Sequence, residues 1–292
     1  MSRAFRQDVA AREAETLIHE LGIDSLPVSP LQIAKEVGID IRPLPAQEQP
    51  GVSGILVRCG NHFGILYSTS IDSVGYQNFS IGHEIGHFRL PGHFESVMQD
   101  GMHASYAGRM GTKDPFELEA DHFSSRLLMP RWLFDEALRT AGEGLDAVVN
   151  LSAQCETSLI ATAIRMTQRS RATFAIVVSQ GRQVDYCFMS DPLREHDAIE
   201  WIRKGTLLPA NSATLKLNGD TSKVESNERV GQDSNMQDWF GDTLEGEVYE
   251  EAIGLGPYGK TLTILTIDEL PDAEELEADE ELEESWTPRF RG

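Results

Sequence analysis

The stretch Phe79-Ser-Ile-Gly-His-Glu-Ile-Gly-His-Phe88 is the most informative part of this 292-residue sequence. It places His83 and His87 four positions apart, so in a helix both imidazoles lie on one face and can reach one cation. Glu84 follows the first histidine and lies near the open position of such a cation, where a carboxylate can take a proton from water. The spacing therefore predicts a metal-binding helix that carries its own general base.

The residues between the histidines predict how this helix packs. Ile81, Ile85 and Phe88 form an apolar stripe at helical spacing, directed away from the histidines. Gly82 and Gly86 are poor helix formers, each costing about 1 kcal/mol relative to alanine. We therefore expect one face to lie in a core and another element to approach closely at the glycines.

A peptidase zinc needs a third protein ligand and an open fourth position. The segment Phe116–Pro130 offers Glu117, which lies on the same face as the apolar residues of a second predicted helix. Glu119 lies toward the flank of that helix and is the less favoured alternative. The apolar face consists of Ala120, Phe123, Ser124, Leu127 and Leu128.

Asp121 follows Glu117 at the i+4 position and faces the same side. It can accept a hydrogen bond from the free ring nitrogen of a ligating histidine, the usual role of a carboxylate behind a metal ligand. The alternative is a simple surface acid. His122 points away from the apolar face, so we expect it to be exposed.

These motifs resemble the ImmA/IrrE family of zinc metallopeptidases, which have a thermolysin-like gluzincin site. The resemblance covers about residues 10–170. It rests on Gly54-Ile-Leu56, on the Phe79–Phe88 stretch, on Glu117–Phe123 and on Leu127–Pro130. Leu21-Gly-Ile23 and Ile33–Ile39 also look like the start of the family's domain. Family usage of Glu-x-x-x-Asn/Asp supports Glu117 and Asp121.

The resemblance implies one Zn²⁺ per chain, held by His83, His87 and Glu117, with Glu84 as the catalytic base. It implies an endopeptidase that cuts a helix-turn-helix (Xre-like) repressor and so derepresses stress, phage or mobile-element genes. The alternative is a non-proteolytic zincin-fold protein of toxin–antitoxin type, or a regulator partner, that sequesters a repressor.

The sequence says less about which residues contact a peptide substrate than about the metal ligands. The strand Ser53–Arg58 or the strand His62–Tyr67 could pair with an extended peptide. The candidates for substrate binding or for stabilising the oxyanion are aromatic residues and histidines near the motif: Tyr67, Tyr76, His93, His103 and Tyr106.

Composition limits the remaining possibilities. The chain has 40% hydrophobic residues, no apolar run of membrane-span length and a polar N-terminus, so we expect a cytoplasmic protein. The three cysteines are widely spaced and form no CxxC pair, which disfavours a thiolate zinc knuckle. The net charge of −22 disfavours direct nucleic-acid binding. Ala147–Met166 looks like a helix-turn-helix, but packing or partner docking is favoured over binding to DNA.

The predicted fold class is α+β. We expect a zincin-like metallopeptidase domain with a small sheet over residues 1–135 and a helix-turn-helix-like segment over 136–170. A C-terminal α/β sensory or partner-recognition domain follows over 171–267. Residues 268–292 form an acidic tail, expected to be disordered because residues 268–284 contain eleven acids and no base.

Overall fold

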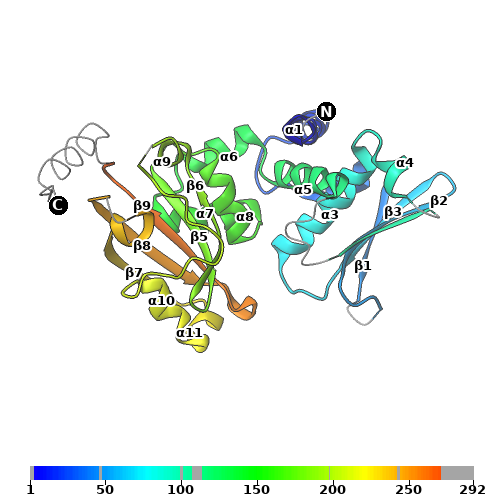
Figure 1. Ribbon diagram of the computed structural model, residues 1–292. Helices are drawn as coiled ribbons and strands as arrows, with labels where there is room; N and C mark the ends of the chain where they lie inside the picture. The colour runs from blue at the N-terminus through cyan, green and yellow to red at the C-terminus, as the bar shows by residue number, and fades with distance from the viewer. Residues whose placement is uncertain are drawn as a thin grey trace, which may run out of the picture. The chain divides into compact units, whose positions relative to one another are not determined.

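The computed structural model describes residues 3–45, 48–98, 101–106, 114–196, 198–241 and 244–270. The chain divides into two compact units, each with its own sheet (Figure 1). Unit 1 contains Met1–Ala141 and Val149–Thr162, and unit 2 contains Gly142–Val148 and Ala163–Gly292. The predicted mixture of helices and strands is therefore confirmed. Within the described ranges, no helix is both long and apolar enough to cross a bilayer.

The sheet of unit 1 has the strand order β1-β3-β2-β4. These strands are β1 (Ile39–Leu44), β2 (Val52–Cys59), β3 (His62–Ser68) and β4 (Met102–Tyr106). β2 and β3 contain the two strands that the sequence predicts and form an antiparallel hairpin. β1 runs parallel to β3, and β4 runs antiparallel to β2. β1 and β4 are therefore the two edges of this sheet.

This topology corrects one expectation. Neither predicted substrate strand is an edge, because β2 and β3 each have a neighbour on both sides. The segment that follows α3 contains the short helix α4 (His93–Val97) and the strand β4. β4 is too short to show a clear alternation, and its pairing with β2 across more than 40 residues of sequence is not visible locally.

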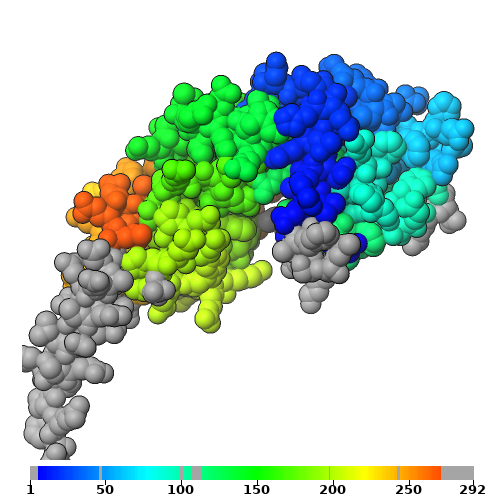
Figure 2. All heavy atoms as spheres, turned by 90° about the horizontal axis from the view of Figure 1, so that it is seen from above, coloured from blue at the N-terminus to red at the C-terminus, as the bar shows by residue number. Residues whose placement is uncertain are grey.

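The helices of unit 1 cover the sheet with one shared core. They are α1 (Arg3–Glu20), α2 (Pro30–Glu36), α3 (Val74–Arg89), α5 (Pro115–Leu128) and α6 (Arg131–Leu138). Leu17, Ile33, Ile65, Ile85 and Phe123 meet in this core, and each buried side chain of this size contributes about 1.5–3 kcal/mol. The opposite face of α1 is exposed, and its blue atoms lie at the surface in Figure 2.

α3 and α5 pack closely, and two glycines make this possible. A Cβ atom on Gly82 would lie 2.6 Å from Ser124 Oγ, and one on Gly86 would lie 3.2 Å from Phe123 Cδ1. Ala120 also lies against Gly86. The predicted close approach at the glycines is confirmed, so the two helices that carry the candidate ligands lie face to face.

The helices α7 (Gly144–Cys155) and α8 (Leu159–Thr167) follow, as the two helical runs in the sequence predict. The sheet of unit 2 has the order β6-β5-β9-β8-β7, with every neighbouring pair antiparallel. Its strands are β5 (Phe174–Gln180), β6 (Gln183–Met189), β7 (Arg229–Asn235), β8 (Glu247–Gly254) and β9 (Thr261–Thr266). Short helices connect them: α9 (Asp191–Arg194), α10 (Ala213–Asn218), α11 (Thr221–Glu225) and α12 (Met236–Phe240). The predicted acidic tail lies outside the described residues from residue 271 onward.

Candidate metal and catalytic site

α3 brings His83, Glu84 and His87 into one buried region. The helix begins after Ser73, whose hydroxyl accepts a hydrogen bond from the Tyr76 N–H and so caps the first turn. The Nε2 atoms of His83 and His87 are 3.0 Å apart, and all three motif side chains are buried. The helical spacing has therefore brought two imidazole nitrogens close enough to bind the same ion.

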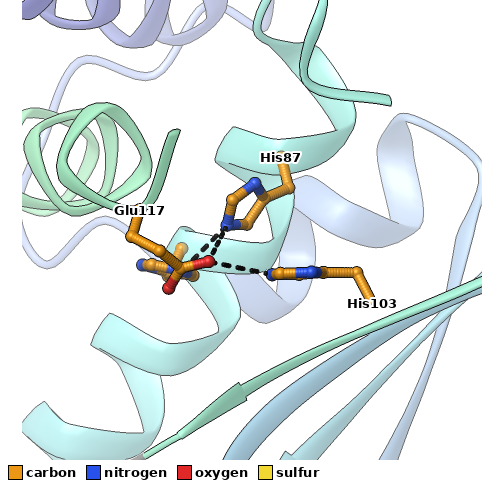
Figure 3. A group of neighbouring side chains, drawn as sticks. His87, His103 and Glu117 are labelled. Carbon is orange, nitrogen blue, oxygen red and sulfur yellow. Dashed lines mark hydrogen bonds and ion pairs between the residues drawn. The ribbon is translucent and has the colours of Figure 1, made fainter. Parts of the chain in front are cut away.

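α5 adds a carboxylate at the same point. Its first turn is fixed by Asp114, which accepts a hydrogen bond from the Phe116 N–H. Glu117 lies in this turn, with its Oε2 3.5 Å from His83 Nε2 and its Oε1 3.5 Å from His87 Nε2. Figure 3 shows the Glu117 carboxylate directed at His87 across the gap between the two helices.

β4 adds a third histidine. The Nε2 of His103 lies 3.2 Å from Glu117 Oε1 (Figure 3). The same nitrogen lies 3.3 Å from Ser105 Oγ. In the sequence, His103 was only one of several candidates for contacting the oxyanion. One signal in the sequence was available: His103 and Ser105 are two positions apart, so in a strand both side chains lie on the same face.

The donor atoms lie close to the spacing of a zinc site. Zinc–ligand bonds of about 2.0–2.2 Å in a tetrahedral site place neighbouring ligand atoms about 3.3–3.6 Å apart. The two imidazole nitrogens are 3.0 Å apart, slightly closer than this range, while His83 lies 3.5 Å from one oxygen of Glu117 and His87 lies 3.5 Å from the other. With His103 included, all four donor atoms lie within 4.8 Å of one another. The cluster is compatible with a metal ion.

Glu84 is the unusual group of the site. Its side chain is completely buried, and neither carboxylate oxygen has a hydrogen-bond partner of normal geometry within the described residues. Burial raises the pKa of Glu84 above its usual range, and His83 and Ser105 offset this only in part. The carboxylate packs against Gly54 of β2, where a Cβ atom would lie 2.8 Å from Glu84 Oε1. A proton acceptor without a partner is thus held beside the donor cluster.

Comparison with known proteins identifies this part of the chain. Residues 34–167 match the family model Peptidase_M78, described as the IrrE N-terminal-like domain. This region belongs to the Peptidase_M78 family. The match contains the whole donor cluster and confirms the ImmA/IrrE resemblance seen in the sequence. The search of curated proteins gave no match.

A solved structure shares the fold of the chain. The Mycobacterium tuberculosis transcriptional regulator matches with a TM-score of 0.58 and 14% sequence identity. The match covers 91% of this chain and 82% of that chain. At this identity, the likeness concerns the fold alone.

Within the Peptidase_M78 domain, each α3 histidine has a different partner behind it. The Nδ1 of His83 lies 2.9 Å from Asp121 Oδ1, while the Nδ1 of His87 lies 3.1 Å from the Nδ1 of His93. His93 in turn lies 3.0 Å from Glu119 Oε2. His93, a candidate for contacting substrate, is completely buried and lies behind His87.

These contacts set opposite charge states on the two histidines. Burial lowers the pKa of His83, but the carboxylates of Asp121 and Glu117 outweigh it and raise that pKa to about 10. Burial lowers the pKa of His87 to about 3. Burial alone would raise the pKa of Glu117, but its contacts with His103, His83 and His87 hold that pKa well below its usual range. Without metal at neutral pH, His83 is therefore protonated and His87 is neutral.

Two of the three tyrosine candidates, Tyr67 and Tyr106, lie outside the donor cluster. Tyr67 is on β3, partly buried against the core of unit 1. Tyr106 ends β4 and is 47% exposed. Glu119, which the sequence places toward the flank of α5, is buried.

Proposed function

We propose that the Peptidase_M78 domain is a zinc-dependent endopeptidase. The observation that carries this proposal is the buried Glu84 carboxylate, which has no hydrogen-bond partner of normal geometry among the residues that the structure describes and lies beside a cluster of metal-donor atoms. An unsatisfied buried polar group costs about 1–3 kcal/mol, so such a group is typical of a site where a ligand or water completes its contacts.

His83, His87 and Glu117 would hold the zinc, which gives the mixed histidine and carboxylate set of a gluzincin. Asp121 would orient His83 from behind. When bound, Zn²⁺ polarises a peptide carbonyl and lowers the pKa of a water to about 7. Glu84 accepts a proton from the attacking water at a carboxylate oxygen and returns it to the nitrogen of the leaving amine. Its raised pKa makes Glu84 a stronger base for this transfer.

β4 is the strand best placed to bind substrate. It is an edge of the sheet of unit 1, and it carries His103 beside the donor cluster. An extended peptide can add to such an edge through main-chain hydrogen bonds. We propose that His103 then donates its Nε2–H to the carbonyl oxygen of the scissile bond, which develops negative charge during attack.

A helix-turn-helix repressor of Xre type is the proposed substrate. This rests on the family resemblance, and the structural neighbour named a transcriptional regulator agrees with a regulatory role. The strongly acidic composition favours a protein partner over nucleic acid. We propose that the sheet of unit 2 serves recognition of the partner or of a signal.

Cleavage of a co-encoded repressor tests this function. The zinc-loaded protein and its Glu84→Gln variant, matched for zinc content, are incubated with the purified repressor, and products are identified by mass spectrometry. Wild type is expected to cut one bond, and Glu84→Gln to leave the repressor intact. Binding of the repressor by both proteins without cleavage by either would instead support the sequestering alternative.

A further inference from the structure

A buried chain of polar side chains runs from His87 away from the donor cluster. His93, the first residue of α4, is completely buried with its Nδ1 3.1 Å from the Nδ1 of His87. The Nε2 of His93 lies 3.0 Å from Glu119 Oε2, and Arg6 of α1 pairs with the other oxygen of Glu119 at 2.9 Å. Side chains from four helices therefore contact one another in succession behind His87, a candidate metal ligand.

With zinc bound to Nε2 of His87, only one placement of protons satisfies both contacts of His93. The Nε2 of His87 lies in the donor cluster, and a neutral imidazole that ligates zinc through Nε2 carries its proton on Nδ1, from which it donates to His93. His93 then has to accept at Nδ1 and keep its own proton on Nε2, from which it donates to Glu119. The opposite tautomer of His93 would set two N–H groups against each other at 3.1 Å and leave Glu119 facing a lone pair.

We propose that His93 and Glu119 are positioning residues that fix the tautomer and ring orientation of His87 and thereby strengthen zinc binding. This rests on the proposed zinc site. Asp121 does the same for His83 in one step, whereas His87 reaches its carboxylate through a second imidazole. A carboxylate that orients a ligating histidine typically contributes 10–100-fold to metal affinity.

Zinc affinity of the full chain tests the proposal without any peptide substrate. Affinity is measured by competition with a chromophoric chelator for wild type, His93→Leu, His93→Gln and the control His62→Leu, which changes an exposed histidine at the start of β3. We expect His93→Leu to bind zinc about 10–100-fold more weakly. His93→Gln should recover part of the loss, because its amide can accept from His87 and donate to Glu119. His62→Leu should match wild type.

A folded His93→Leu protein with zinc affinity within about threefold of wild type would overturn the proposal. Circular dichroism and thermal unfolding of the metal-free variants show whether they fold. If His93→Leu does not fold, the wild-type protein still provides a test. ¹⁵N-histidine NMR of the zinc-loaded chain should place the proton on Nδ1 of His87 and on Nε2 of His93. A proton on Nδ1 of His93 would overturn the proposal.

These measurements separate the positioning role from the proposed function. Neither of them depends on hydrolysis, so a protein that binds zinc through the predicted tautomers but never cleaves a peptide refutes only the peptidase. Cleavage that depends on Glu84, together with unchanged zinc affinity in folded His93→Leu, refutes only the positioning role.

Discussion

Gly54 of β2 lies against Glu84, and a methyl group at this position tests whether the placement of that carboxylate matters. A Cβ atom on Gly54 would lie 2.8 Å from Glu84 Oε1 and 2.9 Å from Glu84 Cγ. Carbon atoms in comfortable contact are about 3.5–4.0 Å apart, so Gly54→Ala must move the Glu84 side chain by about 0.6–1 Å. A displacement of about 1 Å can cost about 100-fold in rate, or about 2.7 kcal/mol of transition-state stabilisation.

The assay measures kcat and zinc affinity for Gly54→Ala and for the control Gly64→Ala. Gly64 is also a crowded strand glycine, though less so than Gly54, and its neighbours are Val57, at 3.0 Å, and Asp40, at 3.6 Å, instead of Glu84. We expect Gly54→Ala to lose about 100-fold in kcat with zinc affinity within about threefold of wild type, and Gly64→Ala to keep its kcat. Wild-type kcat in Gly54→Ala would refute this placement of Glu84 in the reaction.

Three further perturbations address the ligands and the helix packing. Zinc binding should release about one proton per chain between pH 7 and 9, because His83, with its pKa raised to about 10, must lose its proton before Nε2 can bind metal. The apparent zinc affinity then rises with pH across this window, and calorimetry in two buffers of different ionisation enthalpy measures the release; heats that do not depend on buffer would contradict it. His103→Gln should lower kcat about 100-fold with zinc affinity nearly unchanged, whereas an equal loss of zinc affinity would make His103 a ligand instead. Gly82→Ala should lower the free energy of unfolding by about 1–3 kcal/mol, because the added methyl group overpacks against Ser124, and adding Ser124→Ala should restore part of this loss. Chemical denaturation measures both changes, and a Gly82→Ala protein more stable than wild type would show that the helices can separate freely.

The sequence was most informative where local spacing determines the geometry. Helical periodicity places His83 and His87 on one face of α3, and it places Glu117 on the apolar side of α5. The glycines of α3 predicted close packing, since a missing side chain is useful only where another element approaches. Each of these inferences needs only residues within one or two turns of helix.

The sequence was least informative where distant segments meet. His103 reaches the cluster because β4 pairs with β2, and a five-residue strand carries little local signal for this pairing. The periodicity of α5 alone places Glu119 on the flank of the helix. The structure places His93 of α4 and Arg6 of α1 over that flank, so the carboxylate is buried. Burial of a helix face depends on every element that covers it.

A crystal structure of the zinc-loaded full-length chain, with anomalous data collected at the zinc edge, tests the central claim most directly. The predicted result is one zinc ion bonded to His83 Nε2, His87 Nε2 and the Glu117 carboxylate, with a solvent molecule hydrogen-bonded to Glu84. The ion would then occupy the point where these donor atoms converge. Zinc at another position, or a Glu84 carboxylate without access to solvent at the metal, would contradict the assignment of this site as a peptidase centre.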